Sequence, residues 1–135
     1  MAHIKLDRKA ATMTVKLAVL ITAAGLTFAS AALAQNTSDS YCATISEHDK
    51  VASDGFELSD AGSILRQDRA NFHKFGDADG ADQGDDTFAS ANARARIPAM
   101  LDSGGTDPRV LREIVRGTPH VCVDIYRNYI EVYLD

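Results

Sequence analysis

The chain has 135 residues, of which 14 are Lys or Arg and 19 are Asp or Glu, and its formal net charge is −5 at pH 7. This acidic balance argues against nucleic acid as a partner, because a negative surface repels the phosphate backbone, and it disfavours anionic membranes for the same reason. Cationic proteins and metal ions are better electrostatic partners.

The first segment of the chain has the pattern of a secretory signal. Residues 17–34 are apolar and rich in small side chains, and they end in Ala32-Leu33-Ala34. A basic lead, an apolar core and such an Ala-x-Ala end predict a cleaved signal peptide over residues 1–34. Met13 offers an alternative start of translation, and a retained membrane anchor is the competing interpretation of the apolar run. The basic residues of the lead are Lys5, Arg8, Lys9 and Lys16.

Cleavage would leave a small periplasmic or secreted domain. Residues 35–40 are polar and are predicted to form a flexible tail, and residues 41–135 are long enough for a single domain with one core. After Ala34 the chain has ten basic and eighteen acidic side chains, a net charge of −8. Cys42 and Cys122 are its only cysteines, and in an oxidising compartment we expect them to form a disulfide.

Polar and glycine residues mark the first strand and the first helix. A short strand is expected over residues 41–45, followed by a turn over 51–55. Ser59 is the expected N-cap of a helix that runs to about Phe75 and stops at Gly76. One face of this helix is predicted to be apolar and the opposite face basic. The apolar face consists of Ala61, Ile64, Leu65, Phe72 and Phe75. The basic face consists of Arg66, Arg69 and His73.

The central part of the chain predicts a loop and two further helices. Residues 76–86 contain three glycines and five aspartates without apolar periodicity, which is typical of a loop. A second helix is expected from Ser90 to about Leu101, kinked or divided by Pro98. The third helix is marked by an N-cap aspartate, a first-turn proline and a terminal glycine, namely Asp107, Pro108 and Gly117.

The C-terminal residues predict an antiparallel hairpin. A two-residue turn at Arg127-Asn128 places the apolar residues opposite one another on one side, and a shift by one residue would destroy this match. One long strand is the alternative, because Arg-Asn is not a favoured hairpin turn. The predicted fold is therefore α+β, with a short N-terminal strand and three short helices packed on the hairpin and one disulfide. The expected pairs are Val121 with Leu134, Val123 with Val132, and Ile125 with Ile130.

Asp68 is a carboxylate at the centre of the apolar face of the first helix. An unpaired buried carboxylate is costly, so we expect it to be paired or protonated. Arg94, at the border of the apolar face of the second helix, is the predicted partner. Two interpretations stay open: a structural ion pair, and a functional carboxylate with a raised pKa in a pocket.

The aspartate-rich loop suggests a calcium site, since carboxylate oxygens are calcium ligands. The spacing departs from the EF-hand pattern, because with Asp77 as the first position Asp82 replaces the glycine and Phe88 replaces the final glutamate. A solvated acidic loop is therefore the competing interpretation. The candidate ligands are Asp77, Asp79, Asp82, Asp85 and Asp86.

The basic residues Arg66, Arg69 and His73 form a candidate interaction face for an acidic partner or an anion, against the alternative of a solvated helix face. The sequence has no Gly-x-Ser-x-Gly motif and no serine whose setting predicts activation. We therefore expect a non-enzymatic binding, inhibitor or accessory protein without a cofactor that acts on another exported protein. The alternatives are a small secreted hydrolase using Asp68 and a calcium-dependent module. The edge of the hairpin offers a site for pairing with a second copy.

Overall fold

The computed structural model describes residues 36–135, and the predicted signal peptide lies outside the described residues, as does Gln35. The sheet is antiparallel with the strand order β1-β2-β3. Its strands are β1 at Asp39–Thr44, β2 at His120–Ile125 and β3 at Ile130–Leu134. The predicted α+β class is confirmed, and the N-terminal strand pairs with the hairpin.

The first strand begins earlier than predicted. Asp39 and Ser40, expected in the flexible tail, belong to β1, where Asp39 lies opposite Ile125. The backbone N–H and the hydroxyl of Ser38 both donate to the carbonyl oxygen of Ile125, at 2.8 and 2.9 Å. The segment is polar and its own β propensity is low. These bonds hold it in the sheet.

The hairpin has the predicted register. Ile125 lies opposite Ile130, and Val123 lies opposite Val132. The backbone N–H of Tyr126 donates to the carbonyl oxygen of Tyr129 at 2.9 Å, which closes the turn. The alternative of one long strand is therefore excluded.

The first helix, α1 at Ala61–Ala70, is capped by Asp60 rather than by the predicted Ser59. The Asp60 side chain accepts from a backbone N–H three residues later, at 2.8 Å. The chain continues as a π-helical turn, η2 at Asn71–Phe75, and the helix ends at Gly76 with a φ of 65°. This left-handed conformation is the reason for glycine at the predicted stop.

The π-helical turn changes which side chains face the core. A turn that is wider than α-helical rotates the following residues away from their positions on an ideal helix. Phe75, predicted on the apolar face, is 49% exposed, so that part of the prediction is wrong. Ile64 and Leu65 precede the turn and are buried as expected.

The second predicted helix is divided, as Pro98 predicts. Its parts are α2 at Ala91–Arg94 and α3 at Ile97–Ser103, with the proline in the first turn of α3, where its missing N–H breaks no helical hydrogen bond. The third predicted helix is α4 at Pro108–Arg116, and Asp107 is its N-cap.

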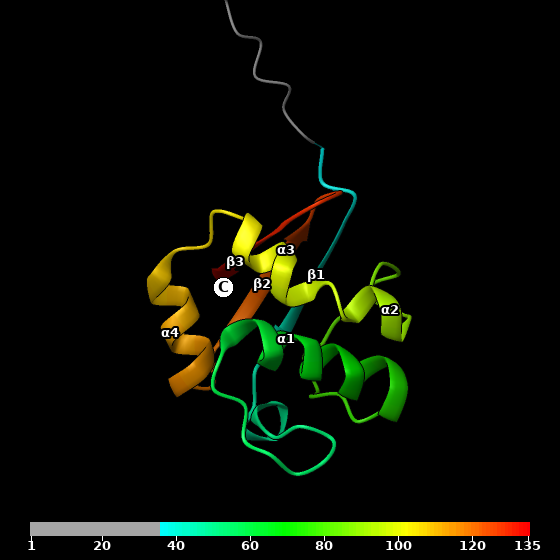
Figure 1. The fold of residues 1–135 in the computed structure, drawn as a ribbon, viewed down its shortest axis with the longest axis vertical. Helices are drawn as coiled ribbons and strands as arrows, with labels where there is room; N and C mark the ends of the chain where they lie inside the picture. The colour runs from blue at the N-terminus through cyan, green and yellow to red at the C-terminus, as the bar shows by residue number, and fades with distance from the viewer. Residues whose placement is uncertain (1–35) are drawn as a thin grey trace, which may run out of the picture. The chain divides into compact units, whose positions relative to one another are not determined.

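The helices cover one side of the sheet (Figure 1). α3 and α4 contact β3, and α1 packs against α3, α4 and a 3-10 helix, η1 at Glu47–Lys50. The backbones of α1 and α3 approach closely, because a Cβ on Gly62 would lie 2.8 Å from the Cα of Pro98. The largest fully buried apolar side chains of the core are Tyr41, Phe88, Ile45, Ile64, Leu65, Ile97, Ile114, Ile125, Ile130, Val121 and Val123.

Candidate functional site

A buried cluster of charges surrounds Arg69 of α1, whose side chain is fully buried. Its Nε donates to Oδ2 of Asp68 at 2.7 Å, and its Nη1 donates to the carbonyl oxygen of Gln83 at 2.8 Å and to Oδ2 of Asp85 at 3.2 Å. The guanidinium carbon lies 3.9 Å from the ring centroid of Tyr41, a cation–π distance. We call the following residues the Arg69 cluster: Tyr41, Asp68, Arg69, His73 and Asp85.

Asp85 connects the Arg69 cluster to the loop that precedes α2. Its Oδ2 lies 2.9 Å from Nε2 of His73, and its Oδ1 accepts from the backbone N–H of Phe88 at 2.6 Å. The Asp85 side chain is fully buried. Asp85 thus bonds to Arg69 of α1, to His73 of η2 and to a backbone N–H of its own loop. The cluster therefore holds the loop against α1 and η2.

Asp68 is buried as predicted, but the predicted partner is wrong. Arg69, the next residue along the helix, forms the ion pair. Nη1 of Arg94 instead donates to the carbonyl oxygens of Phe88 and Ala89, at 3.0 and 2.8 Å. Helical periodicity missed the pair because the loop that follows the helix folds back and covers the side of α1 that an amphipathic pattern assigns to solvent.

Burial raises the pKa of Asp68 to about 7, and the neighbouring charge of Arg69 only partly opposes this shift. Arg69 carries one positive charge between two carboxylates, those of Asp68 and Asp85, so it does not neutralise both. Asp68 is only 1% exposed, which leaves its carboxyl no contact with solvent or with a dissolved substrate. The hydrolase alternative that uses Asp68 therefore gains no support from its position.

The predicted interaction face of Arg66, Arg69 and His73 is not one surface. Arg66 is exposed, whereas Arg69 is fully buried. His73 lies against the buried carboxylate of Asp85. Other parts of the chain cover more of the helix surface than the sequence predicts. Of the three side chains only Arg66 remains exposed.

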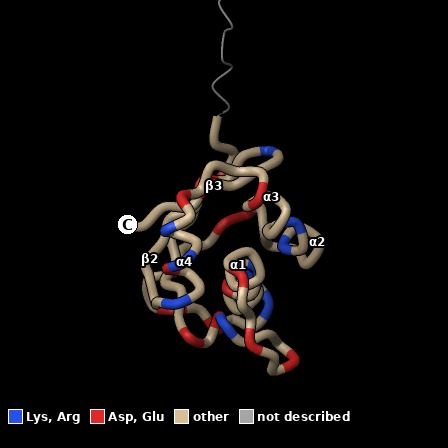
Figure 2. The backbone as a smooth tube through the Cα atoms, turned by 60° about the vertical axis from the view of Figure 1, so that its left-hand side comes forward, with Lys and Arg blue, Asp and Glu red and all other residues tan. Residues whose placement is uncertain are grey.

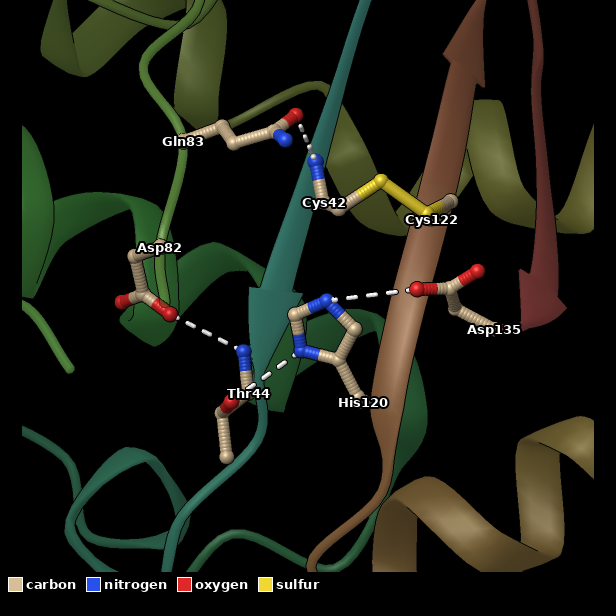
Figure 3. Close-up of a disulfide and its surroundings, with 7 residues drawn as sticks. All are labelled: Cys42, Thr44, Asp82, Gln83, His120, Cys122 and Asp135. Carbon is tan, nitrogen blue, oxygen red and sulfur yellow. Dashed lines mark hydrogen bonds and ion pairs between the residues drawn. A yellow bond between two sulfur atoms is a disulfide. The ribbon is translucent and has the colours of Figure 1, made fainter. Parts of the chain in front are cut away.

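The aspartate-rich loop covers the outer edge of β1 (Figure 3). Oδ1 of Asp82 accepts from the backbone N–H of Thr44 at 2.9 Å. Gln83 donates its backbone N–H to the carbonyl oxygen of Cys42 at 2.8 Å, and its side chain accepts from the N–H of Cys42 at 3.0 Å. Asp39 in turn accepts from two backbone N–H groups of the loop. The loop thus occupies hydrogen-bonding groups that would otherwise form an open sheet edge.

Three of the five aspartates of the loop, Asp77, Asp82 and Asp85, contact different groups of the protein and not a common centre. Asp82 and Asp85 accept from backbone N–H groups, and Oδ2 of Asp77 lies 2.8 Å from Nε2 of His48. Among residues 36–135 no three His, Cys, Asp or Glu side chains are placed to hold a metal ion. The calcium site stays a prediction that no contact in the loop favours.

The other side of the sheet carries a second group of candidate residues. Figure 3 looks onto this side, with helices behind the strands. Neighbouring residues of a strand point to opposite faces, and the buried alternate positions face the helices. We call the remaining positions and the tyrosines of the hairpin turn the outer sheet face: Ser40, Cys42, Thr44, His120, Cys122, Asp124, Tyr126, Tyr129, Glu131 and Tyr133.

The predicted disulfide between Cys42 and Cys122 is confirmed and lies on the outer sheet face. The two residues are directly opposite in the β1–β2 register, with their Cα atoms 4.0 Å apart. Because the N–H and carbonyl of Cys42 are bonded to Gln83, the cysteines form a non-hydrogen-bonded pair, the arrangement in which opposite side chains come closest.

His120 lies beside the disulfide and contacts both neighbouring segments (Figure 3). Its Nδ1 lies 3.1 Å from Oγ1 of Thr44, and its Nε2 lies 3.7 Å from Oδ2 of Asp135. These side-chain contacts join β1, β2 and the end of the chain on one surface, which adds to the covalent constraint of the disulfide.

Tyrosines and carboxylates form the rest of the outer sheet face. The rings of Tyr126 and Tyr129 stack across the hairpin turn, with centroids 4.4 Å apart and an interplanar angle of 12°. Tyr133 is 46% exposed, and Asp124 lies opposite Glu131. The outward strand positions of this face contain no Lys or Arg. Its chemistry is therefore aromatic and acidic.

A comparison with known protein families, with curated proteins and with solved structures finds no match to this chain. Within residues 36–135 no helix is both long enough and apolar enough to cross a membrane. The function is therefore argued from the surfaces of this chain alone.

Proposed function

We propose that this chain is a small, exported, non-enzymatic binding or inhibitor protein, and that its outer sheet face docks on a cationic surface of another exported protein. One observation carries this proposal: helices cover one side of the sheet (Figure 1), and the outward positions of the other side carry tyrosines and carboxylates, with Tyr133 46% exposed. Tyrosine is enriched in protein interfaces, because its ring supplies contact area while its hydroxyl forms hydrogen bonds.

The charge of the outer sheet face favours a basic partner. Asp124 and Glu131 lie opposite each other on it, and Asp135 extends the negative charge along its edge. Complementary charges across an interface speed association and select the partner. Arginine side chains of a partner would in addition stack on the tyrosine rings.

The rigidity of the face supports tight binding. The Cys42–Cys122 disulfide and the three-stranded ladder fix the backbone, and the stacked rings of Tyr126 and Tyr129 restrict each other before a partner arrives. A surface that is ordered in the free protein loses less conformational entropy on association.

Export is part of the same proposal. The pattern of residues 1–34 is that of a signal peptide, and a disulfide between the only two cysteines suits an oxidising compartment. We place the mature protein in the periplasm or outside the cell on these two grounds.

The test is an affinity pull-down from the extracytoplasmic extract of the native host, with the exported protein as bait and mass spectrometry as the readout. We expect one stoichiometric partner with a basic surface, released by salt because screening weakens exposed charge pairs. Tyr133→Ala combined with Glu131→Gln should abolish its retention. The matched control is Phe56→Ala, which removes a ring that is 73% exposed on a loop outside the outer sheet face.

A bait without a partner would contradict the proposal, and so would a partner that Phe56→Ala releases as completely as the face variant. Retention that requires added calcium would favour the calcium-dependent module. A hydrolytic activity that only Asp68→Asn abolishes would favour the hydrolase.

A further inference from the structure

A cleft of about 440 Å³ lies between α1, α2 and the loop that precedes α1. Its lining includes three cations, Arg66 of α1, Lys74 of η2 and Arg94 of α2, and a single carboxylate, that of Asp54. Figure 2 shows basic positions in blue on α1 and α2, although the chain has more acidic than basic residues. We propose that this cleft, which we call the Arg94 cleft, binds an oxyanion: a phosphate or a carboxylate group.

Arg94 is the residue that carries the proposal. It is 94% buried, since its exposed fraction is 6%, and no carboxylate of residues 36–135 forms an ion pair with it. One of its nitrogens, Nη1, donates to two backbone carbonyls, but a guanidinium has five N–H donors and a full positive charge. Arg69, which is also buried, contacts two carboxylates.

Nη1 of Arg94 is bonded to protein carbonyls, and its other nitrogens are not among the fully buried atoms without a partner, so they remain open to a ligand. A guanidinium that is largely shielded from water and has no counter-ion is stabilised by an opposite charge beside it. Carbonyl oxygens supply part of this stabilisation with their dipoles. An oxyanion in the Arg94 cleft supplies the missing charge, and it meets the guanidinium in the planar two-bond geometry that arginine forms with carboxylate and phosphate.

Arg66 and Lys74 add positive charge along the helical wall of the cleft. Both side chains are exposed, and neither forms an ion pair within the described part of the chain. Hydroxyls of Ser53 and Ser63 add neutral donors to the lining. The oxyanion is therefore met by three cations from two helical segments that also form part of the core.

The proposal that the Arg94 cleft binds an oxyanion is independent of the function proposed for the outer sheet face. Its lining comes from α1, η2, α2 and the loop before α1, whereas the outer sheet face consists of strand and hairpin residues. The oxyanion has two sources with the same chemistry, free phosphate and an acidic side chain of a peptide segment. An experiment with one probe for each source separates them.

The experiment is an NMR titration of the protein at low ionic strength with inorganic phosphate and, separately, with a blocked triglutamate peptide. We expect saturable shifts of the backbone amides of Gln67 and Ala91, which line the cleft. Arg66→Ala should weaken binding by about tenfold, the usual effect of losing one charge-assisted hydrogen bond. Arg109→Ala removes an exposed cation of α4 outside the cleft and should leave binding unchanged.

Saturation by phosphate alone supports a free oxyanion as the ligand, and tighter saturation by the peptide supports an acidic segment. The proposal is overturned if neither probe saturates the shifts, or if Arg109→Ala weakens binding as much as Arg66→Ala does. Arg94→Lys keeps the charge and removes the planar donor pair, so it should weaken binding as well. Arg66 is exposed, so Arg66→Ala keeps the test decisive even where Arg94→Lys does not fold.

Discussion

Arg69 lies among more negative charge than it neutralises. Asp68 and Asp85 both contact it, and both are buried. Three buried atoms of the cluster have no hydrogen-bond partner within the described residues, namely Oη of Tyr41, Oδ1 of Asp68 and Nη2 of Arg69. A proton on Asp68 brings the cluster to charge balance, because Arg69 then faces only one ionised carboxylate, that of Asp85. The stability of the fold is therefore coupled to the proton content of this cluster.

Asp68→Asn tests this coupling. Burial raises the folded-state pKa of Asp68 from an ordinary value of 3.8 to about 7, so the folded chain binds this proton more tightly than the unfolded chain does. The resulting stability is complete below the unfolded pKa and is lost as the pH rises through about 7. In urea unfolding, this loss should lower the free energy of unfolding of the wild type by on the order of 4 kcal/mol, and the variant should lack it.

The control for this pH dependence is Asp54→Asn, which changes an exposed carboxylate in the same way. It should keep the wild-type dependence on pH. Asp68 has no special proton affinity if Asp68→Asn and Asp54→Asn give the same pH profile.

Arg69→Met tests the cation itself. Methionine keeps much of the length of the side chain but leaves Asp68 and Asp85 buried without a positive partner. The loss of one partner of a buried ion pair costs about 3–5 kcal/mol, and urea unfolding at constant pH measures it. Arg66→Met is the same substitution on an exposed arginine of the same helix and should change the free energy of unfolding by less than about 0.5 kcal/mol. Similar losses in the two variants would contradict the role of the cluster.

At the scale of the elements, the aspartate-rich loop acts as the cover of β1. Asp82 and Gln83 occupy the outward hydrogen-bonding groups of Thr44 and Cys42. An uncovered strand edge pairs with other chains. Asp82→Ala combined with Gln83→Ala should therefore promote self-association, measured by sedimentation velocity over a concentration series.

The matched control for the edge variant is Asp79→Ala combined with Asp86→Ala. It alters the same loop and removes more negative charge, but neither of these side chains bonds to β1. It should stay as monomeric as the wild type. Association of both variants to the same extent would assign the effect to charge and not to the strand edge.

The free edge of the hairpin is also partly occupied. The backbone N–H of Val132 donates to Oγ1 of Thr106 at 3.0 Å, and a Cβ on Gly104 would overlap the carbonyl oxygen of Ile130. The segment that contains these two residues thus lies against β3. The pairing of this edge with a second copy stays a prediction, and the strand has little edge left for it.

Elements that are specified by residues within or next to them were predictable from the sequence. Asp107 and Pro108 begin α4 because an aspartate cap and a first-turn proline both act within one turn. The hairpin register follows from alternation alone, since one residue of slip would expose the whole apolar set. The disulfide was predictable because the chain offers one pair of cysteines.

The candidate sites were less predictable because their contacts are distant in the chain. Asp85 contacts Arg69, which lies sixteen residues earlier in the chain. The hydrophobic periodicity of a helix does not indicate that a loop folds back over it. The π-helical turn at Asn71–Phe75 has no pattern that distinguishes it from an α-helical turn, yet it turns Phe75 outward. The Arg94 cleft needs residues from three segments, so only the fold brings it together.

At the scale of the whole molecule, the disulfide joins segments near the two ends of the described chain. It closes a loop with a sequence separation of 80 residues. In the chain-entropy description such a loop restricts the unfolded chain by about 4–5 kcal/mol, and measured losses on removal of native disulfides are about 2–5 kcal/mol. We expect the sheet and core to remain in place without it, because β1 would keep its ladder with β2 and its cover by the aspartate-rich loop.

Cys42→Ala combined with Cys122→Ala should therefore lower the free energy of unfolding by about 2–5 kcal/mol while the fold is kept. Guanidinium unfolding measures the loss, and the dispersion of the amide NMR spectrum reports the fold. The wild type treated with a reductant is the control and should match the variant. If the variant is as stable as the oxidised wild type, the covalent constraint is redundant with the ladder. If it is folded but no longer retains the partner captured by the wild type, the disulfide acts mainly by ordering the outer sheet face before binding.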